Sequence, residues 1–147
     1  MAASDMSKVM SGELLYTIDS KGRMSFPPRF REIIGDRFIL TKGLDKQITV
    51  RSEENWNSLV ERISAMPEGR NKEYLKYQFI KCAVTVEADK LGRILIPQTL
   101  RTFAALTKDV YVVGSMDTAE IWDKSTYDLY AQKLSADDLY AALEALG

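Results

Sequence analysis

Two short segments of this 147-residue chain carry the same residue types at the same spacing. Residues 19–23 read Asp-Ser-Lys-Gly-Arg (the first loop), and residues 89–93 read Asp-Lys-Leu-Gly-Arg (the second loop). The glycine supplies the positive φ that a tight turn needs. The aspartate can accept hydrogen bonds from the turn backbone and hold the arginine. Because arginine can bind guanine O6 and N7 through two hydrogen bonds, a turn of this kind can project its arginine into a DNA groove.

The similarity continues after both loops at an offset of 70 residues. Each loop is followed by an apolar run that ends in proline and then by a second arginine, Arg31 or Arg101. The register then slips by three residues, which aligns residues 36–40 with residues 109–113. We interpret the chain as a duplicated half-domain. Two equivalent surface loops on one body suit a ligand with repeated geometry, such as duplex DNA.

Each copy predicts the same order of elements: a hairpin around the tight turn, a short helix, a second hairpin and a longer helix. Ser52 and Ser125 are expected to cap the two longer helices. The expected strands are residues 13–18, 23–26, 37–41, 47–51, 83–88, 93–96, 110–113 and 119–122.

Composition argues against an enzyme. The chain has no histidine, so it lacks the commonest general base and zinc ligand, and it has no Gly-rich phosphate loop. A hydrolase that uses Asp19 and Asp89 is therefore the least favoured interpretation, and we expect no catalytic residue, metal or cofactor. Cys82 is the only cysteine, which excludes an internal disulfide, fits a cytoplasmic protein and predicts a buried apolar role. No apolar run is long enough for a membrane helix.

Charge is unevenly distributed although the net charge is only −1. Residues 19–31 hold four basic side chains and one acidic side chain, a local net charge of +3. The stretch from residue 87 to residue 101 has a local net charge of +1, and from residue 135 onward every charged side chain is acidic. Because local charge governs local contacts, the first repeat is expected to supply most of any contact with DNA.

The two loops, the proline-ended runs and the following arginines resemble the MraZ family of bacterial transcriptional regulators. Further matching pieces are Ser11-Gly12-Glu13, residues 40–45 and the run Glu120-Ile121-Trp122. The resemblance covers nearly the whole chain and implies an α+β fold, in which tandem AbrB-like swapped-hairpin half-units form one small β-barrel with flanking helices. It also implies ring-shaped homo-oligomers that bind direct repeats of double-stranded DNA in the promoter of the division and cell-wall gene cluster, hence a cytoplasmic, nucleoid-associated protein.

The resemblance and the loop chemistry together predict the contacts with DNA. By the resemblance, the aspartate and arginine of the motif fall on the first and last residues of each loop. Lys21 and Lys90 are candidates for phosphate contacts, and Arg29 and Arg31 could add more. The same pairs could instead be ordinary turn-stabilising ion pairs with no ligand. The predicted DNA-binding residues are Asp19, Lys21, Gly22, Arg23, Arg29, Arg31, Asp89, Lys90, Gly92 and Arg93.

The organisation expected along the chain has five parts. They are a flexible extension (residues 1–9), a first AbrB-like repeat with its helix (10–66), a helical segment between the repeats (67–82), a second repeat (83–134) and an acidic C-terminal tail (135–147). Apolar stripes at helical spacing between the repeats, led by Trp56 and Leu59, predict a contact with a neighbouring subunit. A ring-forming protein-interaction scaffold without direct DNA binding is the alternative function.

Overall fold

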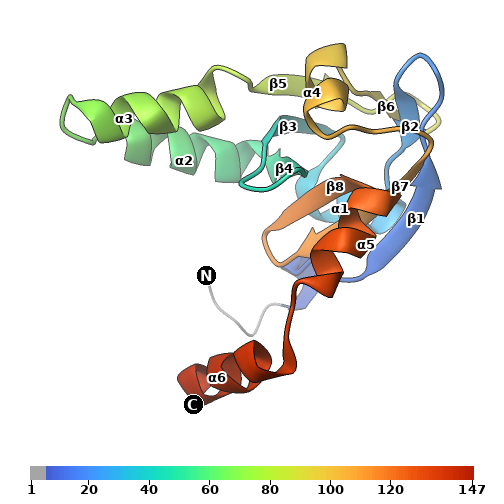
Figure 1. The fold of residues 1–147 in the computed structure, drawn as a ribbon. Helices are drawn as coiled ribbons and strands as arrows, with labels where there is room; N and C mark the ends of the chain where they lie inside the picture. The colour runs from blue at the N-terminus through green and yellow to red at the C-terminus, as the bar shows by residue number, and fades with distance from the viewer. Residues whose placement is uncertain (1–5) are drawn as a thin grey trace.

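The computed structural model describes residues 6–147 and is an α+β fold (Figure 1). The predicted order of strands and helices along the chain is confirmed for both repeats. In chain order the elements are η1 (Met6–Lys8), β1 (Glu13–Thr17), β2 (Arg23–Ser25), α1 (Pro28–Ile34), β3 (Arg37–Lys42), β4 (Ile48–Ser52), α2 (Glu53–Ser64), α3 (Arg70–Leu75), the π-helical η2 (Lys76–Ile80), β5 (Val84–Glu87), β6 (Arg93–Leu95), α4 (Gln98–Phe103), β7 (Asp109–Ser115), β8 (Thr118–Asp123), α5 (Lys124–Gln132) and α6 (Ala136–Leu146).

The strands pair across the repeats. The larger sheet has the order β1-β7-β8-β4-β3-β5, and β2 pairs with β6 in a separate two-stranded ribbon. The second strand pair of each repeat, β3–β4 and β7–β8, is a hairpin as predicted. The first pair is not, because β1 pairs with β7 and β2 with β6. The hairpin predicted around each tight turn is therefore wrong: the turn is present, but its two strands pair with strands of the other repeat.

The strand registers also correct the alignment of the two repeats. Phe38 of β3 pairs with Val86 of β5, and Val110 of β7 pairs with Tyr16 of β1. Phe38 is therefore equivalent to Val110, which makes the slip between the repeats two residues instead of three. A shift by one residue would turn each strand's side chains to the opposite face, whereas both Phe38 and Val110 are completely buried.

The core lies between the sheet and the β2–β6 ribbon, and both repeats fill it with equivalent side chains. In the first repeat aromatic rings dominate, with centroids of Phe26 and Phe38 4.7 Å apart. The second repeat places smaller aliphatic side chains at the same positions. The buried equivalent pairs are Met24 with Ile94, Phe26 with Ile96, Phe30 with Leu100, Phe38 with Val110, and Leu40 with Val112.

A closed barrel is not seen in the described residues. The six-stranded sheet ends at β1 on one side and β5 on the other, and these two strands do not pair. The architecture shown is therefore a mixed helix and sheet structure made of two interlocked repeats.

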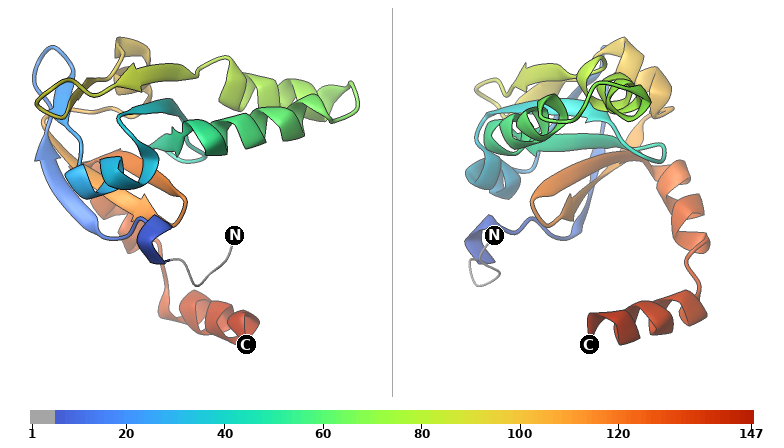
Figure 2. Two further views of the ribbon diagram at one scale, coloured as in Figure 1. Left: turned by 180° about the vertical axis from the view of Figure 1, so that it is seen from behind. Right: turned by 90° about the vertical axis from the view of Figure 1, so that its left-hand side faces the viewer.

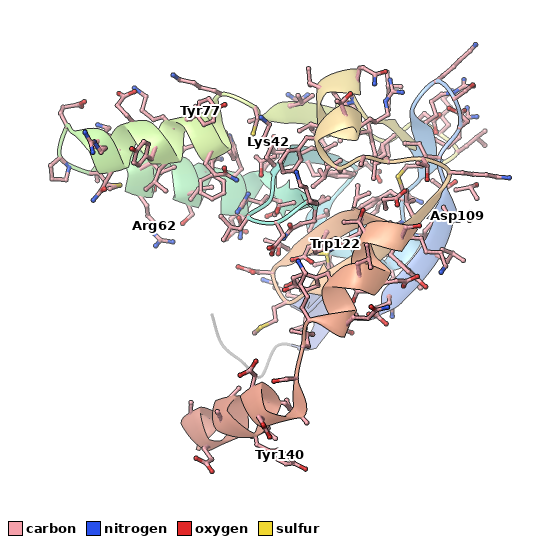
Figure 3. The ribbon with its side chains drawn as sticks, in the orientation of Figure 1. Lys42, Arg62, Tyr77, Asp109, Trp122 and Tyr140 are labelled. Atoms are coloured by element: carbon pink, nitrogen blue, oxygen red, sulfur yellow. The ribbon has the colours of Figure 1, made fainter. Side chains whose placement is uncertain are left out.

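Helices extend away from this body on two sides (Figures 1 and 2). A helical arm (residues 53–80) consists of α2 lying beside α3 and η2, with Lys42 and Tyr77 at its base (Figure 3). Ser52 caps α2, as predicted, by accepting a hydrogen bond from the Asn55 N–H. The predicted cap Ser125 is wrong, because Asp123 caps α5 and accepts from the Ser125 N–H.

Exposed residues lie at both ends of the described chain, Ser7 and Lys8 at one end and residues 135–147 at the other. In the predicted N-terminal extension, residues 1–5 fall outside the described residues, and Met6–Lys8 form one 3₁₀ turn. The predicted acidic tail contains a complete helix, α6, capped by Ser135, and all its residues are exposed. It stands apart from the body in Figures 1 and 2. Within residues 6–147, none of the helices combines the length and apolar character that crossing a membrane requires.

Candidate nucleic-acid interface

A single carboxylate organises the first loop. Oδ1 of Asp19 accepts hydrogen bonds from the backbone N–H groups of Lys21 and Arg23, both at 2.9 Å, and Oδ2 accepts one from Arg23 Nε at 3.0 Å. The Gly22 N–H closes the turn by donating to the Asp19 carbonyl at 3.0 Å. Gly22 has φ +88°, a conformation that glycine adopts without strain. The loop therefore presents its arginine in one defined position.

The second loop repeats this arrangement bond for bond. Asp89 accepts from the N–H groups of Leu91 and Arg93 at 2.9 Å and from Arg93 Nε at 3.0 Å. Gly92, with φ +77°, donates to the Asp89 carbonyl at 2.9 Å. Both ion pairs predicted from the spacing of four residues are present.

The β2–β6 ribbon places the two loops side by side (Figure 2). Met24 and Ile94 face each other across the ribbon and are buried, so the neighbouring residues of both strands point outward. Arg23 lies opposite Leu95, and Arg93 lies opposite Ser25, which puts both arginines on the outer face. Diagonal neighbours of this kind are about 7–8 Å apart. The fold thus combines the two arginines into one surface.

Hydrogen bonding lowers the pKa of both loop carboxyl groups. The backbone N–H of Arg23 is the largest influence and lowers the pKa of Asp19 below its usual value. Partial desolvation opposes this effect, and the Arg23 side chain and the Lys21 N–H lower the pKa further. The same groups of the second loop, led by the Arg93 N–H, lower the pKa of Asp89. At neutral pH each loop is therefore a charged pair held by backbone bonds.

The ion pairs leave part of each arginine available. Only Nε is bound to the carboxylate, and among residues 6–147 the two Nη groups of Arg23 and Arg93 have no hydrogen-bond partner. The two side chains are 45% and 42% exposed. A guanidinium fixed through Nε and open at both Nη atoms can donate two parallel hydrogen bonds to guanine O6 and N7 or to phosphate oxygens.

Comparison with known proteins assigns the chain to a family. A sequence model of the MraZ protein, whose description likens it to antitoxins, matches twice, over residues 9–76 and residues 79–146. The chain belongs to the MraZ family.

Relatives cover nearly the whole chain. A protein of Acetivibrio thermocellus is 40% identical over 140 residues, which is 92% of this chain and 97% of that protein. Proteins of Caldicellulosiruptor bescii and Alkaliphilus metalliredigens are 38% and 42% identical, over 95% and 92% of this chain and 99% and 97% of theirs. All three are named transcriptional regulator MraZ, a class of regulators and not of enzymes.

The structure brings together eight of the ten residues predicted for the MraZ-like site. These are the residues of the two loops: Asp19, Lys21, Gly22, Arg23, Asp89, Lys90, Gly92 and Arg93. Arg29 lies apart from them, where its Nη2 donates to the Ser11 carbonyl at 2.7 Å. Arg31 lies below the second loop, and its Nη1 pairs with Asp36 at 3.1 Å. Both arginines thus have partners within the protein.

Sequence reasoning left out three residues that belong to this surface. Ser25 and Leu95 share the outer face of the ribbon with the loop arginines, and a strand alternation pattern through β2 and β6 would have shown it. Lys108 lines a groove of about 370 Å³ between Ile18 and the two loop arginines. No local pattern marks Lys108, because it reaches the groove only through the pairing of β1 with β7. Among residues 6–147 no cluster of three or more metal-ligating side chains is present.

Proposed function

We propose that this chain is a sequence-specific DNA-binding transcriptional regulator. The observation that carries the proposal is the pair of identically built loops on one ribbon, each with an arginine fixed at Nε and open at both Nη atoms. Support also comes from the names of the relatives. Arg23 and Arg93 are the groups that read base edges, Asp19 and Asp89 hold them in place, and Lys21 and Lys90 contact phosphates.

The proposed working form is a homo-oligomeric ring on direct repeats in the promoter of the division and cell-wall gene cluster, and so a nucleoid-associated protein. One protomer offers a small surface and a net charge of −1. Repeating the loops around a ring lets several weak contacts act together when the operator spacing matches. We infer that the sheet and the β2–β6 ribbon act as the two faces of one small barrel, since side chains from both fill a common core.

The helical arm is the proposed contact between subunits. Its two layers cover much of each other, and Ile63 is buried within them. Tyr74 and Tyr77 remain 64% and 65% exposed, which leaves an aromatic surface on the outside of the arm. A heterologous contact through such a surface forms a ring when its rotation closes after a whole number of subunits.

Footprinting of the purified protein on the promoter upstream of its own gene tests the DNA proposal. Protection of regularly spaced boxes is expected, and raised salt should release the DNA because each neutralised phosphate had displaced a counterion. A purified protein that protects no DNA would instead support the scaffold hypothesis. Binding that does not respond to salt, or that is unchanged in an Arg23→Ala/Arg93→Ala variant, would contradict the roles proposed for the loop residues.

Light scattering of a Tyr74→Glu variant tests the assembly. Tyr74 is exposed, so the charge is tolerated by the fold, and smaller species with weaker DNA binding are expected. Leu129→Glu is a matched control, since Leu129 is 61% exposed on α5, away from the arm. A wild-type protein that stays monomeric at micromolar concentration would contradict the ring.

A further inference from the structure

The second arginine of each repeat lies beneath the loop of the other repeat. Arg101 comes from α4 of the second repeat, yet it packs under Gly22 of the first loop; Arg31 comes from α1 of the first repeat and packs under Gly92 of the second loop. A Cβ added to Gly22 would lie 2.6 Å from Arg101 Nε, and one added to Gly92 would lie 2.7 Å from Arg31 Nη2. Each guanidinium therefore occupies the space that a loop side chain would need.

Hydrogen bonds connect each arginine to the loop it supports. Nε of Arg101 donates to the Ile96 carbonyl at 2.8 Å, and the Ile96 N–H donates to the Gly22 carbonyl at 2.8 Å. On the other side, Nε of Arg31 donates to the Phe26 carbonyl at 3.4 Å, and the Phe26 N–H donates to the Gly92 carbonyl at 3.0 Å. A single residue, Ile96 or Phe26, thus joins each arginine to the opposite glycine.

We propose that Arg31 and Arg101 are positioning residues that act crosswise, Arg101 fixing the first loop and Arg31 the second. The inference rests on the proposed DNA-binding role of the loops. Arg31 and Arg101 each support the tight turn that orients the loop arginine of the other repeat. The contact that one repeat makes with a base therefore depends on a side chain of the other repeat. One repeat alone therefore lacks the arginine that positions its own loop.

Arg31 and Arg101 are not held in place by the same partners. The carbonyl of Asp36, whose carboxylate pairs with Arg31, accepts a hydrogen bond from the Ala88 N–H before the second loop. The Lys108 carbonyl accepts the equivalent bond from the Ile18 N–H before the first loop. Lys108 is therefore equivalent to Asp36, so the second repeat has a lysine where the first has the carboxylate that pairs with Arg31. The first loop consequently depends on the close packing of Arg101 and on its bond to Ile96.

A crossed set of double variants tests the proposal in a DNA shift assay. Arg101→Ala is expected to weaken operator binding roughly tenfold, because a misplaced Arg23 loses much of its interaction with a base. Combined with Arg23→Ala it should add less than about twofold, since the loop it positions has already lost its arginine. Combined with Arg93→Ala, the two losses should multiply. Arg31→Ala should show the opposite pattern. Losses that multiply in all four combinations would overturn the crosswise roles.

Two further variants separate positioning from simple charge or stability. Arg101→Lys keeps the charge but loses the planar guanidinium, so it should not restore binding; restoration would make Arg101 a phosphate contact and overturn the proposal. A Cβ at Gly22 would meet the Arg101 guanidinium and the Ile96 carbonyl oxygen, whereas one at Gly35, which has a similar positive φ of +87° against +88°, would meet no atom within 4 Å. Only Gly22→Ala should weaken binding, and equal losses would contradict the brace. If Arg101→Ala fails to fold, Arg101→Lys takes its place in the double variants.

An NMR measurement without DNA keeps the brace separate from the proposed function. The amide protons of Lys21 and Arg23 should exchange faster with solvent in Arg101→Ala, while those of Leu91 and Arg93 stay unchanged. Arg31→Ala should reverse this. If wild-type protein does not bind the operator, the function fails but this readout still tests the brace. Exchange that changes in both loops, or in neither, would overturn it.

Discussion

The two repeats share a framework but differ at the surface that meets a ligand. The loops use the same bonds at nearly the same distances, and their glycines have φ +88° and +77°. Around that framework the first repeat carries Lys21 at the tip and the second Leu91, which is 73% exposed. Duplication has therefore kept what holds the arginine in place and changed what surrounds it. The difference predicts that the repeats contribute equally to the framework and unequally to binding.

The largest expected effect concerns the core, where the repeats differ in side-chain size. Phe38→Ala removes a fully buried ring that packs on Phe26 and should lower the free energy of unfolding by about 3–5 kcal/mol. Val110→Ala, at the equivalent position, removes only two methyl groups and should cost about 2 kcal/mol. Urea unfolding of both variants measures the difference. Equal losses would show that the larger ring gives the first repeat no additional stability.

The next effect concerns the two loop arginines. Arg23→Ala and Arg93→Ala should each leave the fold intact, because both side chains lie outside the core. Removing a bidentate base contact costs about 1–3 kcal/mol, and we expect Arg23→Ala to weaken binding more, since the first repeat has the higher local positive charge. A shift assay on the same operator compares them. A larger effect for Arg93→Ala would reverse the assignment of the two repeats.

Exchanging the loop tips should have a smaller effect. Leu91→Lys gives the second loop a cation at the position of Lys21, and Lys21→Leu does the reverse. The first change should strengthen DNA binding and steepen its dependence on salt. Lys21→Leu should weaken DNA binding and make it less dependent on salt. The logarithmic salt slope should fall by about one for each phosphate that is no longer neutralised. The base preference of binding should stay the same, because the side chains at the loop tips are proposed to contact phosphates. A changed base preference would mean that a tip side chain contacts bases.

The sequence allowed the loops to be located and their bonds to be predicted, because both depend on residues within five positions of each other. Asp19 and Arg23 are four apart, and the turn between them brings them together whatever the rest of the chain does. The order of the elements followed for the same reason. Local patterns were sufficient for the loops and for the Ser52 cap, but they placed the cap of α5 on Ser125 instead of Asp123.

Pairing across the repeats was beyond local patterns. A tight turn between β1 and β2 favours a hairpin, but burial of the core side chains pairs β2 with β6 and β1 with β7. The apolar run in β7 can be aligned with β3 with a slip of either two or three residues. Only the strand pairing in the structure, which fixes the face to which each side chain points, distinguishes the two alignments. Arg31 was interpreted as a phosphate contact because its neighbour in space, Gly92, lies 61 residues away in the sequence.

The smallest expected effect is a pKa that changes little when an arginine is removed. The leading cause of the lowered pKa of Asp19 is the backbone N–H of residue 23, which alanine also supplies. In Arg23→Ala, NMR titration of the Asp19 carboxyl should therefore still give a pKa below the ordinary value, though closer to it than in wild type. Because the folded pKa lies below the unfolded one, the carboxylate's contribution to stability is complete above the unfolded pKa and is lost as the pH falls through the folded pKa.

Asp89 should behave in the same way in Arg93→Ala, since the same groups lower its pKa in the same order. A return to the ordinary pKa in either variant would show that the arginine side chain, and not the turn backbone, holds that loop together, and different outcomes for Asp19 and Asp89 would show that the two frameworks are not equivalent.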